Sequence, residues 1–464
     1  MNGNLYALLA SRFPGDRRKP AFETLGGGSL SYADLEAGAA RLAALLKAKS
    51  VAPGDRVAVQ SPKSLQAVML YLAVLKAGGA YLPLNTAYTK TEIDYFLADA
   101  EPALFVTDAE ALAREANGLT PLEAAHDASA SDLAAIVYTS GTTGRSKGAM
   151  LSHGALAANG LALTEAWGFT GADTLLHALP IYHVHGLFIA LHCVFLAGAK
   201  ALWLAKFDED QVLAALGRST VMMGVPTYYT RLLADPRFGP EACKAMRLFI
   251  SGSAPLLPAT FDEFEARAGM RLLERYGMSE AAIIASNPLK RERIAGSVGY
   301  PLPGVSMRVA DDGIVQIKGP SLTSGYWRNP DKTAEAFTAD GYFITGDVGR
   351  QDADGRLWLS GRVSDLIISG GLNVYPKEIE LVLDGQPGVV ESAVIGCPHP
   401  DFGEGVVAVV AGEGEEAALI AAARESLAAF KCPKRVFFVA DLPRNAMGKV
   451  LKAELRRAYA ETFA

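Results

Sequence analysis

The sequence predicts an α/β protein with a large N-terminal domain of covered sheets and a small α+β C-terminal domain. At 464 residues the chain exceeds the length at which a single hydrophobic core stops growing. Short apolar runs alternate with Ala/Leu-rich helical stretches over most of the chain, a pattern typical of parallel sheets covered by helices. After residue 340 the pattern changes to short strands separated by Asp-Gly and Gly-Gly turns.

These patterns predict the individual elements and the domain limits. We expect helices over residues 32–49 and 64–78, and we place the two domains at residues 1–361 and 362–464. The small domain is expected to contain two helices and a strand pair. The expected strands lie at residues 55–60, 103–108, 133–138, 174–180, 201–207, 221–226, 389–398 and 405–412.

Composition excludes several classes of function. The formal net charge is −6, from 44 basic and 50 acidic residues, so we expect no nucleic-acid partner. No uninterrupted apolar run reaches the roughly 20 residues that span a bilayer, and the N-terminus has no basic start or cleavage site, so we expect no membrane partner. The four cysteines show neither metal-binding spacing nor a disulfide framework, which favours a cytoplasmic location.

The stretch "YTSGTTGRSKG" at residues 138–148 concentrates glycines, hydroxyl groups and the cations Arg145 and Lys147. It is not a Walker A motif, because Lys147 precedes Gly148 and is not followed by Ser or Thr. The following "AMLSH" is expected to form a strand, so no helix N-terminus faces the loop. Backbone N–H groups, hydroxyls and cations at this density are typical of a phosphate-binding loop, although a plain surface turn is the alternative for the loop alone.

Four further segments accompany this loop in a fixed order. They are "RYGMSE" at 275–280, "YFITGDVG" at 342–349, "GRVSDLI" at 361–367 and "PRNAMGKV" at 443–450. Together with the loop they resemble the AMP-forming acyl-CoA synthetases, and the resemblance covers essentially the whole chain. It implies that a carboxylate attacks the α-phosphate of ATP to give an acyl-AMP and pyrophosphate, after which the thiol of coenzyme A displaces AMP. ATP, Mg²⁺ and coenzyme A are therefore expected.

The resemblance assigns the groups that act on phosphate. Residues 139–147 are expected to bind the β- and γ-phosphates, and Glu280 is expected to bind Mg²⁺ together with Thr139. A hard oxygen ligand suits this cation. Lys449 is expected to reach from the small domain to the attacking carboxylate and the α-phosphate, where negative charge builds up.

The resemblance also assigns the nucleoside contacts. Tyr276 is expected to stack on adenine beside the small residues "SGSAP" at 251–255, and Asp347 and Arg362 to bind the ribose hydroxyls. The full set expected to contact ATP or coenzyme A is Thr139, Ser140, Gly141, Thr142, Thr143, Gly144, Lys147, Gly252, Ser253, Ala254, Pro255, Glu274, Arg275, Tyr276, Gly277, Met278, Ser279, Asp347, Arg362, Ser369, Gly370 and Gly371.

The two half-reactions place different demands on the small domain, and the family rotates that domain between them. The resemblance places the hinge at Ser364, where the family usually has Asp or Lys. After rotation, residues 369–376 are expected to line the channel for the pantetheine arm of coenzyme A.

The expected acyl pocket resembles that of the malonate-activating members of the family. It carries His183, His185, Arg231, Ser286 and Arg293. A buried cation costs several kcal/mol unless it is paired, so a second carboxylate on the substrate is the natural partner of Arg231 or Arg293. A structural salt bridge is the alternative role for either arginine. The segment "AAIIASNP" at 281–288 is less polar than is usual there, and we therefore expect methylmalonate to be accepted as well as malonate.

Two other functions remain open at this point. One is an AMP-forming CoA ligase for another small carboxylic acid, such as succinate or oxalate. The other is an adenylating module that loads a carrier protein, or a related nucleotide-binding protein that no longer catalyses. The intact motifs and the lack of a carrier-like segment with an attachment serine disfavour the latter.

Overall fold

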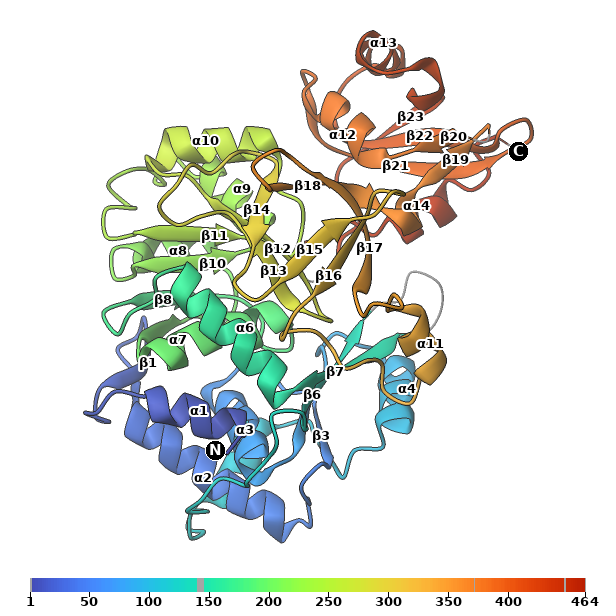
Figure 1. Ribbon diagram of the computed structural model, residues 1–464. Coiled ribbons are helices and arrows are strands. Elements are labelled where there is room, and N and C mark those ends of the chain that lie inside the picture. Colours follow the sequence, from blue (N-terminus) through green and yellow to red (C-terminus); the bar gives the residue numbers. More distant parts are fainter. Residues whose placement is uncertain (1, 140–145, 371, 446–447, 464) are drawn as a thin grey trace.

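A five-stranded sheet occupies the N-terminal part of the computed structural model, which describes residues 2–139, 146–370, 372–445 and 448–463 (Figure 1). Its order is β5-β3-β4-β6-β7, with only β7 antiparallel. The strands are β3 (Arg56–Val59), β4 (Ala80–Pro83), β5 (Leu104–Val106), β6 (Leu133–Thr139) and β7 (Lys147–Ser152). The associated helices are α2 (Tyr32–Ala48), α3 (Leu65–Ala77), α4 (Lys90–Ala100) and α5 (Ala109–Ala116).

Local sequence signals explain where these helices begin and end. α2 starts at a capping box in which Ser31 and Asp34 each accept the other's backbone N–H. α3 starts at the Ser64 cap and ends at Gly78, whose φ of 85° is the left-handed conformation that glycine adopts without strain. Because α3 is apolar on nearly all sides, it is buried between α2 and the sheet.

A second sheet of 13 strands forms the rest of the large domain. Its order is β15-β16-β17-β18-β14-β13-β12-β11-β10-β8-β9-β1-β2, and the stretch from β12 to β1 is parallel. The strands are β1 (Pro20–Thr24), β2 (Ser29–Ser31), β8 (Thr174–His177), β9 (Lys200–Trp203), β10 (Val221–Gly224), β11 (Leu248–Ser251), β12 (Leu273–Met278), β13 (Ala282–Ser286), β14 (Ser297–Pro301), β15 (Ser306–Val309), β16 (Ile314–Lys318), β17 (Phe343–Gln351) and β18 (Leu357–Arg362). The helices are α1 (Leu5–Arg12), α6 (His153–Ala166), the π-helix η1 (His185–Ala190), α7 (Leu191–Ala197), α8 (Glu209–Leu216), α9 (Pro226–Ala234), α10 (Pro258–Ala268) and α11 (Pro330–Glu335).

The C-terminal part has its own sheet and core, beside β17 and β18 in Figure 1. β18 ends in the large sheet at Arg362, the short helix η2 (Val363–Asp365) follows, and β19 begins at Ile367 in the small sheet. The other elements are β20 (Leu372–Val374), α12 (Pro376–Asp384), β21 (Val389–His399), β22 (Gly403–Gly412), α13 (Glu416–Ser426), η3 (Ala429–Lys431), β23 (Arg435–Val439) and α14 (Lys452–Ala458).

The predicted fold class, a large α/β domain followed by a small α+β domain, is confirmed. Both long helices and all eight strands lie within one to four residues of their expected ends, and the strand expected after the glycine-rich loop is β7. The limit between residues 361 and 362 stays a prediction, although the chain changes sheets close to it. Among the described residues, no helix is long and apolar enough to cross a membrane.

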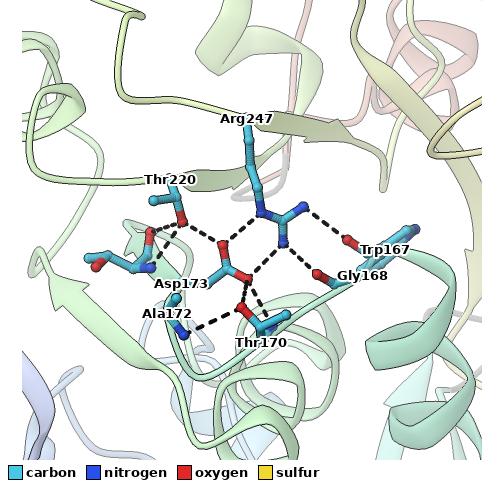
Figure 2. Close-up of polar contacts among 8 residues, drawn as sticks. Trp167, Gly168, Thr170, Ala172, Asp173, Thr220 and Arg247 are labelled. Carbon is cyan, nitrogen blue, oxygen red and sulfur yellow. Dashed lines mark hydrogen bonds and ion pairs between the residues drawn. The ribbon is translucent and has the colours of Figure 1, made fainter.

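A buried ion pair fixes the amino ends of three strands in the large sheet (Figure 2). Asp173, Thr220 and Arg247 directly precede β8, β10 and β11, respectively. Arg247 donates to both carboxylate oxygens of Asp173 at 2.7 and 2.9 Å, and Thr220 donates to one of them at 2.7 Å. Burial alone would raise the pKa of Asp173, but these hydrogen bonds outweigh it and the pKa lies below its ordinary value.

We expect Asp173→Ala to lower the free energy of unfolding by about 2–3 kcal/mol, because it leaves a partly buried guanidinium without its partner. Urea denaturation checks this. Asp340→Ala is the matched control, since Asp340 also receives two hydrogen bonds from one arginine, Arg308, but at the exposed surface. An equal loss in both variants would contradict the structural role of the Asp173 pair.

Candidate active site

Three residues from different strands form a buried polar chain. Tyr276 of β12 donates its hydroxyl hydrogen to Asp347 at 2.5 Å, and Arg362 of β18 donates to the other carboxylate oxygen of Asp347 at 2.7 Å. Asp347 and Arg362 are also cross-strand partners, which sets their spacing. Burial would lower the pKa of Arg362, but the carboxylate of Asp347 raises it above its ordinary value. The structure thus brings together the three side chains expected to contact the nucleoside.

A second polar chain joins the glycine-rich loop to Glu280. The register of β6 and β7 pairs Thr139 with Lys147, and the ammonium of Lys147 lies 4.5 Å from the ring centre of Tyr326. Tyr326 donates its hydroxyl hydrogen to Glu280 at 3.2 Å. Burial raises the pKa of Glu280. A desolvated carboxylate beside a cation is suited to binding a second cation, since a metal ion would offset the cost of burying its charge.

Tyr326 was not predicted from the sequence. It lies in a segment whose backbone pairs with β7, through Met150 N–H to the Gly325 carbonyl at 3.0 Å and Trp327 N–H to the Gly148 carbonyl at 2.8 Å. The pairing places the tyrosine between Lys147 and Glu280. The only signal in the sequence is a tyrosine in a Gly- and Ser-rich stretch, which does not reveal this long-range pairing.

A third cluster surrounds the guanidinium of Arg275, which follows Glu274 on β12. Arg275 donates to the hydroxyl of Ser253 at 3.4 Å, and the same hydroxyl lies 3.2 Å from Nδ1 of His185. His183 is next to them, because its Nδ1 accepts the backbone N–H of His185 at 3.2 Å. Gly252 is required here: a Cβ atom at this position would lie 2.4 Å from Cζ of Arg275.

The positive charge of this cluster is concentrated on Arg275. Arg275 is 5% exposed, its Nε has no hydrogen-bond partner among the described residues, and no described carboxylate forms a salt bridge with it. Burial lowers the pKa of Arg275 to about 9, so it is cationic at neutral pH. Burial, and then the charge of Arg275, lower the pKa of His183 to about 4 and that of His185 well below its ordinary value. Both imidazoles are therefore neutral.

Three residues expected in the acyl pocket have other contacts. Arg231 is exposed on α9 and lies 3.8 Å from Glu209. Arg293 donates to three backbone carbonyls, at distances of 2.6 to 3.1 Å, so its guanidinium braces a loop. Ser286 accepts the indole N–H of Trp167 at 3.0 Å and donates to the Asn287 carbonyl. Ser286 lies directly across from Arg275 in the antiparallel pairing of β12 and β13, whereas the contacts of Arg231 and Arg293 are with other residues.

Lys449 approaches the large domain through its loop. The preceding residue, Gly448, packs against Thr227 of α9, where a Cβ atom would lie 2.9 Å from the threonine hydroxyl. The Lys449 side chain keeps contact with solvent, yet desolvation and the nearby charge of Arg362 lower its pKa. The lysine that the sequence predicts to be catalytic thus lies within electrostatic range of Arg362 and Asp347 in this arrangement of the domains.

The remaining predicted residues fall into three groups. Ser364, the expected hinge, lies in η2, where its carbonyl accepts from Arg456 at 3.4 Å. Ser369 and Gly370 lie at the β19–β20 turn, beside the exposed Ile368 and Leu372. Ala254 and Pro255 follow β11, and Gly277, Met278 and Ser279 end β12 or follow it. Ser140, Gly141, Thr142, Thr143, Gly144 and Gly371 lie outside the described residues.

Family models cover most of the chain. A model described as AMP-binding enzyme matches residues 10–327, and one described as AMP-binding enzyme C-terminal domain matches residues 378–449. The chain belongs to the AMP-binding enzyme family, as the order of its motifs indicated.

Individual relatives refine the comparison. MatB from Rhodopseudomonas palustris is 49% identical over the whole of both chains, with a TM-score of 0.97 for its ATP-bound structure and 0.85 for its apo structure. A malonate–CoA ligase of Arabidopsis thaliana is 40% identical over 70% of this chain and 61% of its own length. A feruloyl-CoA synthase of Amycolatopsis sp. is 36% identical over 94% of this chain and 95% of its own.

Glu274 adds a pH-sensitive group beside the Arg275 cluster. One of its carboxylate oxygens accepts the Leu256 N–H at 3.3 Å, and the other has no partner among the described residues. Burial raises the pKa of Glu274 to about 8, against smaller opposing effects of the Leu256 hydrogen bond and of Lys377 on α12. The carboxyl group is therefore mostly neutral at pH 7 and can both donate and accept hydrogen bonds.

We expect Glu274→Gln to remove part of the pH dependence of folding stability. As pH rises above about 4, the unfolded state loses this proton first, so the stability due to the neutral group falls until pH passes the folded pKa of about 8. Urea denaturation at pH 5, 6, 7 and 8 should therefore show wild type losing stability relative to the variant. Glu263→Gln, at an exposed position on α10, is the control. A stability difference that does not change with pH would contradict a buried neutral Glu274.

Proposed function

We propose that this protein is an AMP-forming CoA ligase for malonate, with methylmalonate as a second substrate. The reaction uses ATP to form an acyl-AMP and pyrophosphate, and then transfers the acyl group to the thiol of coenzyme A, releasing AMP. Likeness over the whole chain to ATP-bound MatB, and over 70% of the chain to a malonate–CoA ligase, supports this reaction. A feruloyl-CoA synthase at 36% identity shows that the family likeness alone leaves the acid open.

The unpaired guanidinium of Arg275 is the observation that favours a dicarboxylate. Burying a cation without a partner costs several kcal/mol, and a second carboxylate on the acid would supply that partner. A feruloyl side chain carries no such anion and would leave the charge unpaired. Since His183 and His185 are neutral, they provide hydrogen bonds to the substrate but no second positive charge.

In the first half-reaction the chain supplies charge and orientation. Arg275 holds the distal carboxylate of malonate, which directs the other carboxylate toward the nucleotide. Asp347 and Arg362 hold the ribose, with Tyr276 against the base. Lys449 neutralises charge between the attacking carboxylate and the α-phosphate as it develops.

Mg²⁺ would be held by Glu280 with Thr139, and when bound it screens the charge of the triphosphate. Lys147 adds a fixed cation on the same side, oriented by Tyr326. The higher TM-score with ATP-bound than with apo MatB supports the reading that this domain arrangement is the one for acyl-AMP formation. Rotation about Ser364 would then bring residues 369–376 toward the acyl-AMP for the thiol step.

The four cysteines are free and buried, which fits a reducing compartment, and we infer a cytoplasmic location. Their burial raises the pKa of each thiol, so none is activated as a nucleophile.

Pyrophosphate release with malonate, methylmalonate, succinate and acetate tests the proposed function. We expect kcat/KM for malonate to exceed that for acetate by about 100-fold or more, because truncating one partner of a buried ion pair costs about 3–5 kcal/mol. Product analysis with coenzyme A should show the thioester and AMP. Equal turnover of acetate and malonate would refute the dicarboxylate assignment. AMP formation without any thioester would refute the ligase.

Arg275→Met should shift the preference between acids. We expect kcat/KM for malonate to fall by about 100-fold, while that for acetate changes little or rises, because the substitution removes an unpaired buried charge and keeps most of the side-chain volume. Arg231→Met is the comparison, since Arg231 was the competing candidate from the sequence. A larger loss of malonate activity in Arg231→Met than in Arg275→Met would assign the distal carboxylate to Arg231 instead.

A further inference from the structure

Backbone hydrogen bonds join the described residues on either side of the Lys449 loop, 443–445 and 448–451. The Leu451 N–H donates to the Pro443 carbonyl at 2.8 Å, and the Asn445 N–H donates to the Lys449 carbonyl at 2.9 Å. The Lys449 N–H donates to the side-chain oxygen of Asn445 at 3.0 Å. These bonds shape the turn, but they do not attach it to the body of the small domain.

Arg444 makes that attachment. Its Nη1 donates to the carbonyl of Gly448 at 2.8 Å, and its Nη2 is hydrogen-bonded to the carboxylate of Glu391 on β21. About three quarters of each of the two charged side chains is buried, so the pair is shielded from water and salt. The guanidinium thus links the turn to the 11-residue strand β21, which pairs with β22 along nearly its whole length.

The acceptor of the first hydrogen bond is the carbonyl of the peptide bond that leads into Lys449. Fixing this carbonyl fixes the orientation of the peptide plane, and with it the direction in which the Lys449 side chain leaves the backbone. The same peptide packs on the large domain, because Gly448 contacts Thr227. A displacement of about 1 Å in a reacting group can cost about 100-fold in rate. A small shift of this turn would therefore slow a reaction that depends on Lys449.

We propose that Arg444, held by Glu391, is the positioning residue for Lys449 in acyl-AMP formation. The inference rests on the proposed function, in which Lys449 acts at the α-phosphate. Arg444 itself contacts neither substrate. It acts on the first half-reaction only, since the α-phosphate bond is already made when a preformed acyl-AMP reacts with coenzyme A.

Separate assays of the two half-reactions test the proposal. Adenylation is followed by malonate-dependent pyrophosphate release, and thioester formation by reaction of supplied malonyl-AMP with coenzyme A. For Arg444→Ala we expect adenylation kcat to fall about 10- to 100-fold, with KM for ATP and the thioester step changed less than threefold. The adenylation kcat of Arg444→Lys should lie between those of wild type and Arg444→Ala. An ammonium can neutralise Glu391, but it lacks the guanidinium fork that also reaches Gly448.

The coupling between Arg444 and Lys449 separates positioning from general destabilisation. In a Lys449→Ala background, Arg444→Ala should lower adenylation no further, because there is no ammonium left to position. Arg435→Ala is the matched control: Arg435 also forms an ion pair within the small domain, with Glu416 at 2.9 Å, but on β23 and α13. It should leave both half-reactions unchanged, and thermal unfolding should show all variants folded at the assay temperature.

Three results would overturn the proposal: an adenylation rate within threefold of wild type in Arg444→Ala, equal losses in both half-reactions, or a double variant well below Lys449→Ala. Normal adenylation by Lys449→Ala would instead refute the role of Lys449, and the proposal for Arg444 with it. Loss in Lys449→Ala with none in Arg444→Ala would leave the proposed function standing and refute only the positioning role.

Discussion

The proposed acyl side of the site depends on one constraint, the burial of a guanidinium that no carboxylate among the described residues pairs with. Arg275 is held between Ser253 and the Gly252 backbone, among imidazoles that burial, and then its own charge, keep neutral. The paired charges Asp173 and Arg247 lie elsewhere in the same sheet, at the amino ends of β8 and β11. A site that keeps one charge unpaired and the rest neutral selects its ligand by charge first and by size second.

On the proposed nucleotide side of the site, by contrast with Arg275, the polar groups are already paired with one another. Tyr276, Asp347 and Arg362 form one chain, and Lys147, Tyr326 and Glu280 form another. Such pairing keeps the side chains in place before the ligand binds. Lys449 comes from the C-terminal part of the chain, which has its own sheet, so under the proposed function this charge is supplied by a part that could move away between steps.

Much of the fold could be predicted from the sequence, since strands, helices and caps are set by local patterns such as the Ser31–Asp34 capping box. The motifs predicted that Asp347 and Arg362 would lie together, as the structure shows, while their contacts with the ribose stay a prediction. The contacts of a site residue could not be predicted where they depend on whether its side chain is buried. Arg231, Arg275 and Arg293 are all arginines near apolar residues in the sequence, and only packing shows that Arg231 is exposed and Arg293 is engaged by carbonyls. The Arg444–Glu391 pair and Tyr326 depend on contacts between distant segments, which a single sequence does not encode locally.

The central claim is that the charge of Arg275 is completed by the distal carboxylate of the substrate. The most direct measurement is the affinity of the purified protein for two unreactive acyl-adenylate analogues, one malonyl and one acetyl, by titration calorimetry at fixed ionic strength. The account predicts that the malonyl analogue binds at least about 100-fold more tightly. Equal affinities for the two analogues would contradict it.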